Sequence, residues 1–198
     1  MSSSPLLDSF IDALQCLPGV GKKSAQRIAF QLLQRDRDSA LRLADVMREA
    51  MAQIGQCTRC RNFCETEVCR TCESVKRDQS LLCVVENPLD VAAISQSSDY
   101  QGLFFVLMGH LSPIDGITPA KLGMETLKLR LGEGQVKELI VATGTTMEGE
   151  ATAHYLKELA AGLDVATSRI AFGVPVGGEL EYMDSSTLSL ALSSRRAY

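Results

Sequence analysis

Five of the seven cysteines fall in one short stretch, and the spacing of four of them is typical of a metal site. Cys57 and Cys60 form one CxxC pair, Cys69 and Cys72 form a second, and eight residues separate the pairs. Each pair can chelate through one turn, and four thiolates complete a closed tetrahedral shell around Zn²⁺. A closed shell leaves no position for a catalytic water, so we predict one structural zinc ion per chain.

The remaining cysteines are expected to lie outside this site. A redox CxxC is the competing interpretation, but two adjacent pairs favour metal binding over thiol exchange. Cys64 lies between the pairs, and the symmetry of the spacing favours the other four as ligands. Cys16 and Cys83 stand in apolar runs, which is typical of small core residues.

A glycine-containing turn, LPGVGKK, offers a second chemistry, the binding of phosphate. Gly19 and Gly21 allow a foreign backbone to approach closely. The helix expected from about Lys22 begins with free N–H groups that suit an anion, and Lys22, Lys23 and Arg27 add positive charge there. The turn therefore predicts a helix-hairpin-helix that binds a DNA backbone without reading bases. The alternative is a plain turn between helices with an exposed basic face.

Carboxylates at expected strand ends form a third candidate site. Glu86 ends an apolar run, and Glu148 and Glu150 begin a helix that follows a later apolar run. Ligands gather at the carboxyl ends of parallel strands, where carboxylates can hold Mg²⁺ for phosphoryl transfer. Acidic residues in a first helical turn also complement the helix dipole without binding anything.

The elements that must position these residues change along the chain. Apolar residues at helical spacing predict three helices in the first 55 residues, and apolar runs at 81–85, 103–108 and 139–142 predict strands. Helical patterns at about 88–96, 119–131 and 149–161 alternate with the strands, which indicates parallel βαβ units. We predict four parts: a helical DNA-binding region (1–55), a four-cysteine zinc finger (56–73), an α/β domain (79–175) and a C-terminal segment (176–198).

Charge divides the chain of 198 residues into two unequal parts, although its formal net charge is only −4. Residues 20–77 carry 12 basic against 7 acidic side chains, and residues 79–198 carry 8 against 14. This division predicts nucleic acid at the first part and another partner or a metal at the second, with solvated surface charge as the alternative. No apolar run approaches the ~20 residues of a membrane span. The first residues lack the basic region of a secretory signal, so we expect a cytoplasmic protein.

The sequence also resembles known proteins. The order of strand, Glu86, helix, strand and acidic turn resembles a Toprim domain, as in topoisomerases and DnaG-type primases. Six features occur in order: LPGVGKKSAQRIAFQLL, the cysteine pairs, VVENPLDVAAI, LSPIDGI, TTMEGEATA and GVPVGGELEYMD. Together, over nearly the whole chain, they resemble the RecR family of bacterial recombination mediators. The implied fold class is a multi-part α+β chain with a helix-hairpin-helix, a small four-cysteine finger, a Toprim-type parallel sheet and a C-terminal helical segment.

The resemblance implies a role in the repair of DNA damage together with RecO and RecF. Such proteins help RecA displace single-strand-binding protein at gaps, so the DNA partner is expected to be a gap or a junction of single strand and duplex. They are associated with tetrameric rings able to encircle DNA, in exchange with dimers. A nucleoid-associated, non-membrane location follows from the same resemblance.

The same segments bear on whether the chain is an enzyme. Topoisomerase-like Toprim domains resemble ATDPDREGE, with two aspartates as metal ligands, whereas this chain has ATGTTMEGE. Gly144 and Thr146 therefore occupy the aspartate positions, and Glu86, Glu148 and Glu150 remain as a weak Mg²⁺ site at best. We predict no catalytic residues and a carboxylate surface for a protein partner, which the family resemblance associates with RecO. A Mg²⁺-dependent nuclease or topoisomerase is the first alternative, and a scaffold without DNA contact is the second.

Three positions depart from the usual pattern of the family. Phe105 stands in a segment that resembles YHVL in relatives, and Phe172 stands at a position that is commonly basic. Ser194 replaces a typical glycine. No role is transferred to these positions.

Overall fold

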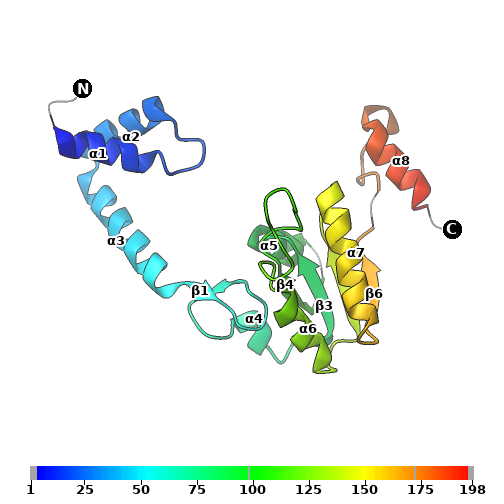
Figure 1. Cartoon of the computed structure of the whole chain (residues 1–198). Coiled ribbons are helices and arrows are strands. Elements are labelled where there is room, and N and C mark those ends of the chain that lie inside the picture. Colours follow the sequence, from blue (N-terminus) through cyan, green and yellow to red (C-terminus); the bar gives the residue numbers. More distant parts are fainter. Residues whose placement is uncertain (1–3, 98, 172, 196–198) are drawn as a thin grey trace. The chain divides into compact units, whose positions relative to one another are not determined.

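The computed structural model describes residues 4–97, 99–171 and 173–195. The chain forms two compact units, residues 1–54 and 55–198 (Figure 1). The first is entirely helical in its described part, and the second contains the cysteine cluster, a parallel sheet and a C-terminal helix. The predicted fold class, a mixed α+β chain of several parts, is confirmed.

The first unit contains three helices: α1 (Pro5–Leu14), α2 (Lys22–Arg35) and α3 (Arg37–Gln53). Ile11 of α1 is buried against Ala25 and Ala29 of α2, and both alanines are fully enclosed. Small alanine side chains on one helical face let the two helices approach closely. The turn between α1 and α2 contains Gly19 at a φ of 77°, a left-handed conformation that glycine adopts without strain.

The second unit begins with the small elements of the cysteine region and continues with alternating strands and helices. In chain order these are β1 (Gly55–Gln56), β2 (Phe63–Cys64), α4 (Arg70–Glu73), β3 (Asp78–Val85), α5 (Pro88–Ser97), β4 (Gly102–Val106), α6 (Met124–Gly132), β5 (Glu138–Ala142), α7 (Met147–Ala161), β6 (Ala166–Arg169), the short 3₁₀ helix η1 (Leu180–Tyr182) and α8 (Ser185–Ser193).

Four strands form the parallel sheet in the order β4-β3-β5-β6. Leu82 of β3 pairs with Leu103 of β4 and with Leu139 of β5, so the three predicted apolar runs lie side by side. Sequence patterning did not predict β6, because its residues ATSR contain no apolar run. In the described part of the chain it is an edge strand that pairs with β5 alone, and its position depends on that pairing.

Helices cover both faces of the sheet. Leu82 and Val84 of β3 point to the face covered by α6 and α7, while Cys83 and Val85 point to the face covered by α5. This alternation follows the two-residue period of a strand, and burial on both faces explains why the strands are apolar runs. Figure 1 shows α7 lying along the sheet beside β6.

Several single-residue expectations can be compared with this fold. Phe105 is fully buried in the core on the α6–α7 side, and Ser194 ends α8 by donating from its hydroxyl to the Leu190 carbonyl. Phe172 lies outside the described residues. Cys83 is buried, as expected. The prediction that Cys16 is a core residue was wrong, because this side chain is exposed in the turn after α1.

Within residues 4–97, 99–171 and 173–195, no helix has both the length and the apolar character that a membrane span requires.

Candidate functional site

The four cysteines of the two CxxC pairs converge on one point. Their Sγ atoms all lie within 4.8 Å of one another, and every one of these side chains is buried. Among the described residues, they are the only group of three or more potential ligands that converges in this way. Four sulfur atoms at such separations fit a tetrahedral shell around a thiophilic ion such as zinc.

Local backbone turns bring each pair together. The Arg61 N–H donates to the Cys57 carbonyl at 2.8 Å, and the Cys72 N–H donates to the Cys69 carbonyl at 2.9 Å. Cys69 precedes α4 as its N-cap, and its own N–H donates to the Cys57 sulfur at 3.3 Å. Cys64 lies outside the cluster and donates its thiol to the Thr66 carbonyl at 2.9 Å.

Protons are unequally shared in this cluster when no ion is bound. The pKa of Cys72 is lowered to about 6, first because the Cys60 thiol donates a hydrogen bond to it; Arg130 also favours the thiolate, and burial opposes it. The pKa of Cys60 is raised, first because its thiol donates this hydrogen bond and second because it is buried. Burial raises the pKa of Cys69 to about 11. Binding of a divalent ion to these cysteines would displace thiol protons.

The finger, defined as residues 55–73, packs against the α/β part of its own unit. The Val106 N–H at the end of β4 donates to the Cys60 carbonyl at 2.8 Å. The Arg61 guanidinium donates to the Leu107 carbonyl at 3.1 Å and to the Lys121 carbonyl at 3.0 Å. A Cβ at Gly123 would overlap the Arg61 side chain, so the absence of a side chain there makes room for this contact.

Arg130 contributes a second guanidinium from the α/β part. It lies on α6 and is only 4% exposed, and its Nη1 donates to the carbonyls of Arg59 and Phe104, each at 3.0 Å. Arg59 itself forms an ion pair with Glu133 at 2.7 Å. The metal site, the end of β4 and α6 are therefore joined by polar contacts.

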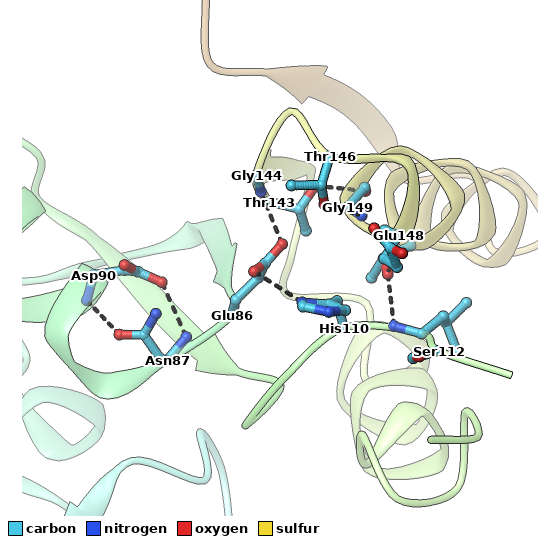
Figure 2. A network of polar contacts seen from close by, with 12 residues as sticks. Glu86, Asn87, Asp90, His110, Ser112, Thr143, Gly144, Thr146, Glu148 and Gly149 are labelled. Atoms are coloured by element: carbon cyan, nitrogen blue, oxygen red, sulfur yellow. Dashed lines mark hydrogen bonds and ion pairs between the residues drawn. The ribbon is translucent and has the colours of Figure 1, made fainter. Parts of the chain in front are cut away.

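The strand-end carboxylate Glu86 has two protein partners, which come from two different segments of the chain. Its Oε1 accepts from the Gly144 N–H at 2.8 Å, and its Oε2 lies 3.3 Å from Nδ1 of His110. Figure 2 shows the carboxylate between these two groups. Sequence patterning did not predict the pairing of His110 with Glu86. The nearby Asp90 instead accepts from the Asn87 N–H at 3.0 Å (Figure 2).

The two positions that carry aspartates in topoisomerase-like Toprim domains have other roles here. A Cβ built on Gly144 would lie 3.5 Å from Oε1 of Glu86, so an aspartate there would face Glu86 directly. Thr146 is the N-cap of α7, and its hydroxyl accepts from the Gly149 N–H at 3.1 Å (Figure 2). The backbone of Gly149 lies so close to the backbone of Gly144 that a Cβ on Gly149 would overlap the Gly144 carbonyl.

The remaining predicted carboxylates lie in the first turn of α7. Glu150 accepts from Arg169 at 2.6 Å, and this charged hydrogen bond lowers the pKa of Glu150. Arg169 also donates to the Gly144 carbonyl at 3.3 Å. The Glu148 side chain is half-buried. The three glutamates thus lie on one end of the α/β part, but they do not form a converging ligand group with each other or with Asp90.

The predicted phosphate-binding residues surround the start of α2. Gly21 is the N-cap of this helix and provides no side-chain cap, so the first N–H groups have no capping side chain. Lys22, Lys23 and Arg27 are all exposed. An uncapped helix start beside three exposed cations has the charge that suits an anion.

Sequence reasoning missed the arginines that join the finger to the α/β part. Arg130 had a detectable signal, because it shares a helical face with Leu127 and Leu131, both fully buried. A charged residue inside an apolar stripe indicates a buried role. Arg61 gave no comparable signal, because its partners are backbone carbonyls distant in the sequence.

These parts together define a class of protein. A helix-hairpin-helix unit, a four-cysteine metal site and a Toprim-like parallel sheet in one chain are typical of a protein that works on DNA in recombination and repair. Family models match RecR, helix-hairpin-helix, over residues 7–51, Toprim domain over residues 80–171, and RecR, C-terminal, over residues 173–196.

A curated relative covers the whole chain. The chain is 54% identical over 198 residues to the "Recombination protein RecR" of Alcanivorax borkumensis. The matched region covers 100% of this chain and 99% of that protein. The chain therefore belongs to the RecR family of recombination proteins, and this family supports a role in recombinational repair.

Proposed function

We propose that the chain is a non-enzymatic, DNA-binding recombination mediator. In this proposal it acts with RecO and RecF to help load RecA on gaps coated with single-strand-binding protein. The observation that carries the non-enzymatic part is the environment of Glu86, which pairs with His110 and the Gly144 N–H. Two aspartates that would complete a catalytic metal site are replaced, by a glycine without a side chain and by a helix-capping threonine.

The proposed DNA contact is the turn between α1 and α2. Gly19, Gly21, Lys22, Lys23 and Arg27 would bind phosphates through backbone amides and cations, without reading bases. The left-handed Gly19, the uncapped start of α2 and the exposure of the three cations support this assignment. The DNA partner is proposed to be a gap or a junction of single strand and duplex.

The proposed protein partner site is the acidic end of the Toprim-like part. Glu86, Glu148 and Glu150 are assigned to the contact with RecO, and Mg²⁺ binds there weakly if at all. We further propose a ring-like homotetramer in exchange with dimers, and a cytoplasmic, nucleoid-associated location. The acidic balance of residues 79–198 supports a basic protein partner.

The metal at the four cysteines is proposed to be one zinc ion per chain. Cys57, Cys60, Cys69 and Cys72 would hold it, and when bound it supplies a closed tetrahedral centre that stabilises the fold. The burial and convergence of the four sulfur atoms support this assignment.

Charge reversal tests the DNA contact. Lys23→Glu with Arg27→Glu is expected to weaken DNA binding and to lower the slope of log affinity against log salt by about 0.7 to 0.9 for each phosphate that the variant no longer neutralises. The matched control is Arg42→Glu with Arg48→Glu, which changes the net charge equally at exposed positions of α3. Equal reductions of affinity in both double variants, or an unchanged salt slope, would contradict the assignment.

A nuclease assay tests the alternative enzymatic function. The purified protein is incubated with supercoiled plasmid, gapped duplex and single-stranded DNA in Mg²⁺, and the DNA is resolved on gels. We expect all three substrates to stay intact and supercoiled plasmid to stay unrelaxed. Cleavage or relaxation that copurifies with the protein would replace the mediator proposal with an enzymatic one.

Assembly and partnership can be tested together. Light scattering of the protein alone, with gapped DNA and with RecO is expected to report a multimer and larger complexes with both partners. Loss of the RecO complex in Glu148→Lys, with the multimer retained, would locate that interface on the acidic end. A strictly monomeric protein in all three conditions would contradict the ring.

A further inference from the structure

Arg130 is the only buried charged side chain among the residues that the structure describes. It lies on α6 between the apolar positions Leu127 and Leu131. Taking a charged group out of water is costly unless an opposite charge compensates it. The burial of this guanidinium therefore requires a counter-charge nearby.

The hydrogen bonds of Arg130 do not supply that counter-charge. Nη1 donates to two neutral backbone carbonyls, those of Arg59 and Phe104. Nη2 is fully enclosed and has no hydrogen-bond partner, and within the described residues no carboxylate forms an ion pair with Arg130. A buried cation that lacks an anionic side-chain partner and keeps one unsatisfied nitrogen indicates that another anionic group lies beside it.

Arg130 reaches the finger beside one of the clustered cysteines, because its Nη1 donates to the carbonyl of Arg59, the residue before Cys60. Burial lowers the pKa of the Arg130 guanidinium, whereas Cys72, Cys60 and Cys57 would raise it as thiolates and Arg59 lowers it. Arg59 is already balanced by Glu133 at 2.7 Å. The negative charge that compensates Arg130 can therefore come only from cysteine thiolates among these neighbours.

A bound metal makes this negative charge permanent. Four thiolates carry more negative charge than a divalent ion carries positive charge, so a four-thiolate centre is a net anion. We propose that Arg130 is the counter-cation of a thiolate-bound divalent ion at the four cysteines, and that this pairing joins metal binding and the α6–β4 region into one cooperative unit. The inference rests on the proposed metal site and assigns a residue outside the two CxxC pairs to it.

The proposal has a specific structural consequence. When the ion leaves, thiolates take up protons and the centre loses its net negative charge. Arg130 then stays buried without compensation, and the helix that carries it is destabilised. Loss of the metal should therefore loosen α6 and the end of β4 as well as the finger.

The first test compares metal retention in variants of this position. Arg130→Gln removes the charge but keeps a side-chain N–H donor for a carbonyl, and Arg130→Lys keeps the charge. Lys128→Gln, which removes an exposed cation from the same helix, is the matched control. Zinc affinity is measured by competition with a chromogenic chelator. We expect Arg130→Gln to bind zinc about 10- to 100-fold more weakly, Arg130→Lys to retain most of the affinity, and Lys128→Gln to match the native chain.

The second test separates charge compensation from ordinary packing. Thermal unfolding of native and Arg130→Gln protein is measured with zinc and after its removal. Charge compensation predicts that the substitution lowers the unfolding temperature with zinc and has little effect, or a stabilising one, without it. A merely structural role of the two carbonyl hydrogen bonds predicts equal decreases in both states, and that result would overturn the proposal.

The third test needs no variant, so it applies even if Arg130→Gln does not fold. Hydrogen exchange of the native chain is followed before and after zinc removal. We expect faster exchange in residues 102–107 and 124–132 as well as 55–73, with β6 unchanged; acceleration confined to 55–73 would overturn the proposal. A native chain that binds no zinc would instead refute the metal assignment itself, so the two failures are distinguishable.

Discussion

The cysteine cluster and the strand-end carboxylates belong to the same unit of the molecule, yet they are built in opposite ways. In the cluster, four potential ligand atoms lie within 4.8 Å of one another. At the acidic end of the sheet, two of the three predicted carboxylates bind protein groups instead: Glu86 pairs with His110 and the Gly144 N–H, and Glu150 pairs with Arg169.

This difference bears on which of the two groups needs an ion to balance its charge. Thiolates that converge without enough protein cations repel one another, and an ion relieves that repulsion. A carboxylate that has gained its own donors no longer needs an ion, because the donors supply the positive charge. Gly144 and Thr146 take part in such contacts, since the Gly144 N–H donates to Glu86 and the Thr146 hydroxyl caps α7 by accepting from the Gly149 N–H.

The largest effect is expected from removing one cluster ligand. Metal binding contributes on the order of 10 kcal/mol to folding in comparable sites, so Cys60→Ser should lose the metal and leave residues 55–73 unfolded. Cys64→Ser is the matched control, since Cys64 lies outside the cluster. Elemental analysis measures the bound metal, and hydrogen exchange measures the unfolding of residues 55–73. Full metal retention in Cys60→Ser would show that the cluster is not the site.

An intermediate effect is expected from restoring the missing aspartates at the strand ends. Gly144→Asp with Thr146→Asp should place a second carboxylate against Glu86, because a Cβ at Gly144 would lie 3.5 Å from Oε1. Asp is also a good helix N-cap, so α7 should keep its cap. Repulsion between the carboxylates should lower the stability without Mg²⁺ by about 1–2 kcal/mol.

The stability of the double variant and of the native chain is measured by thermal unfolding at increasing Mg²⁺ concentrations. The double variant should be stabilised by Mg²⁺, by about 2.7 kcal/mol at a concentration 100 times its dissociation constant. The native chain should respond little at the same concentrations. A native response as large as that of the double variant would remove the contrast between the two regions.

The smallest effect is expected at the Glu150–Arg169 ion pair. Arg169 lowers the pKa of Glu150 in the folded chain, so the pair adds stability above the unfolded-state value of about 4.3 and loses it as the pH falls. Glu150 is about half exposed, so Glu150→Gln should cost under about 1 kcal/mol at pH 7 and nothing in acid. Chemical denaturation at both pH values, with the exposed Glu125→Gln as control, measures the difference. A destabilisation that is larger at acid pH would contradict the assigned pairing.

Much of the fold could be predicted from local patterns. Apolar residues at helical spacing predicted the three helices of the first unit, and buried apolar runs predicted β3, β4 and β5. The strand β6 was not predicted, because a short polar edge strand depends on pairing with β5 rather than on its own composition. The expected helix at 119–131 begins only at Met124, since residues 119–123 form a turn that ends in the left-handed Gly123.

The candidate sites likewise include one part that local spacing predicts and one part that depends on residues distant in the sequence. The convergence of Cys57, Cys60, Cys69 and Cys72 was predictable, because the spacing within each pair allows one turn to place both sulfur atoms on one ion. The pairing of Glu86 with His110 joins residues 24 positions apart and was not predictable from spacing.

The sequence by itself determined the ligands of the proposed metal, the glycines and cations of the hairpin, and the presence of Gly144 and Thr146 before α7, since each is a matter of residue type at short range. Only the tertiary structure decided which distant groups the buried and half-buried arginines contact. Arg130 reaches the Arg59 carbonyl across 71 positions of the chain, and Arg61 reaches the Leu107 carbonyl across 46. Compensation of a buried charge depends on what packing brings within a few ångströms, and no local periodicity encodes that.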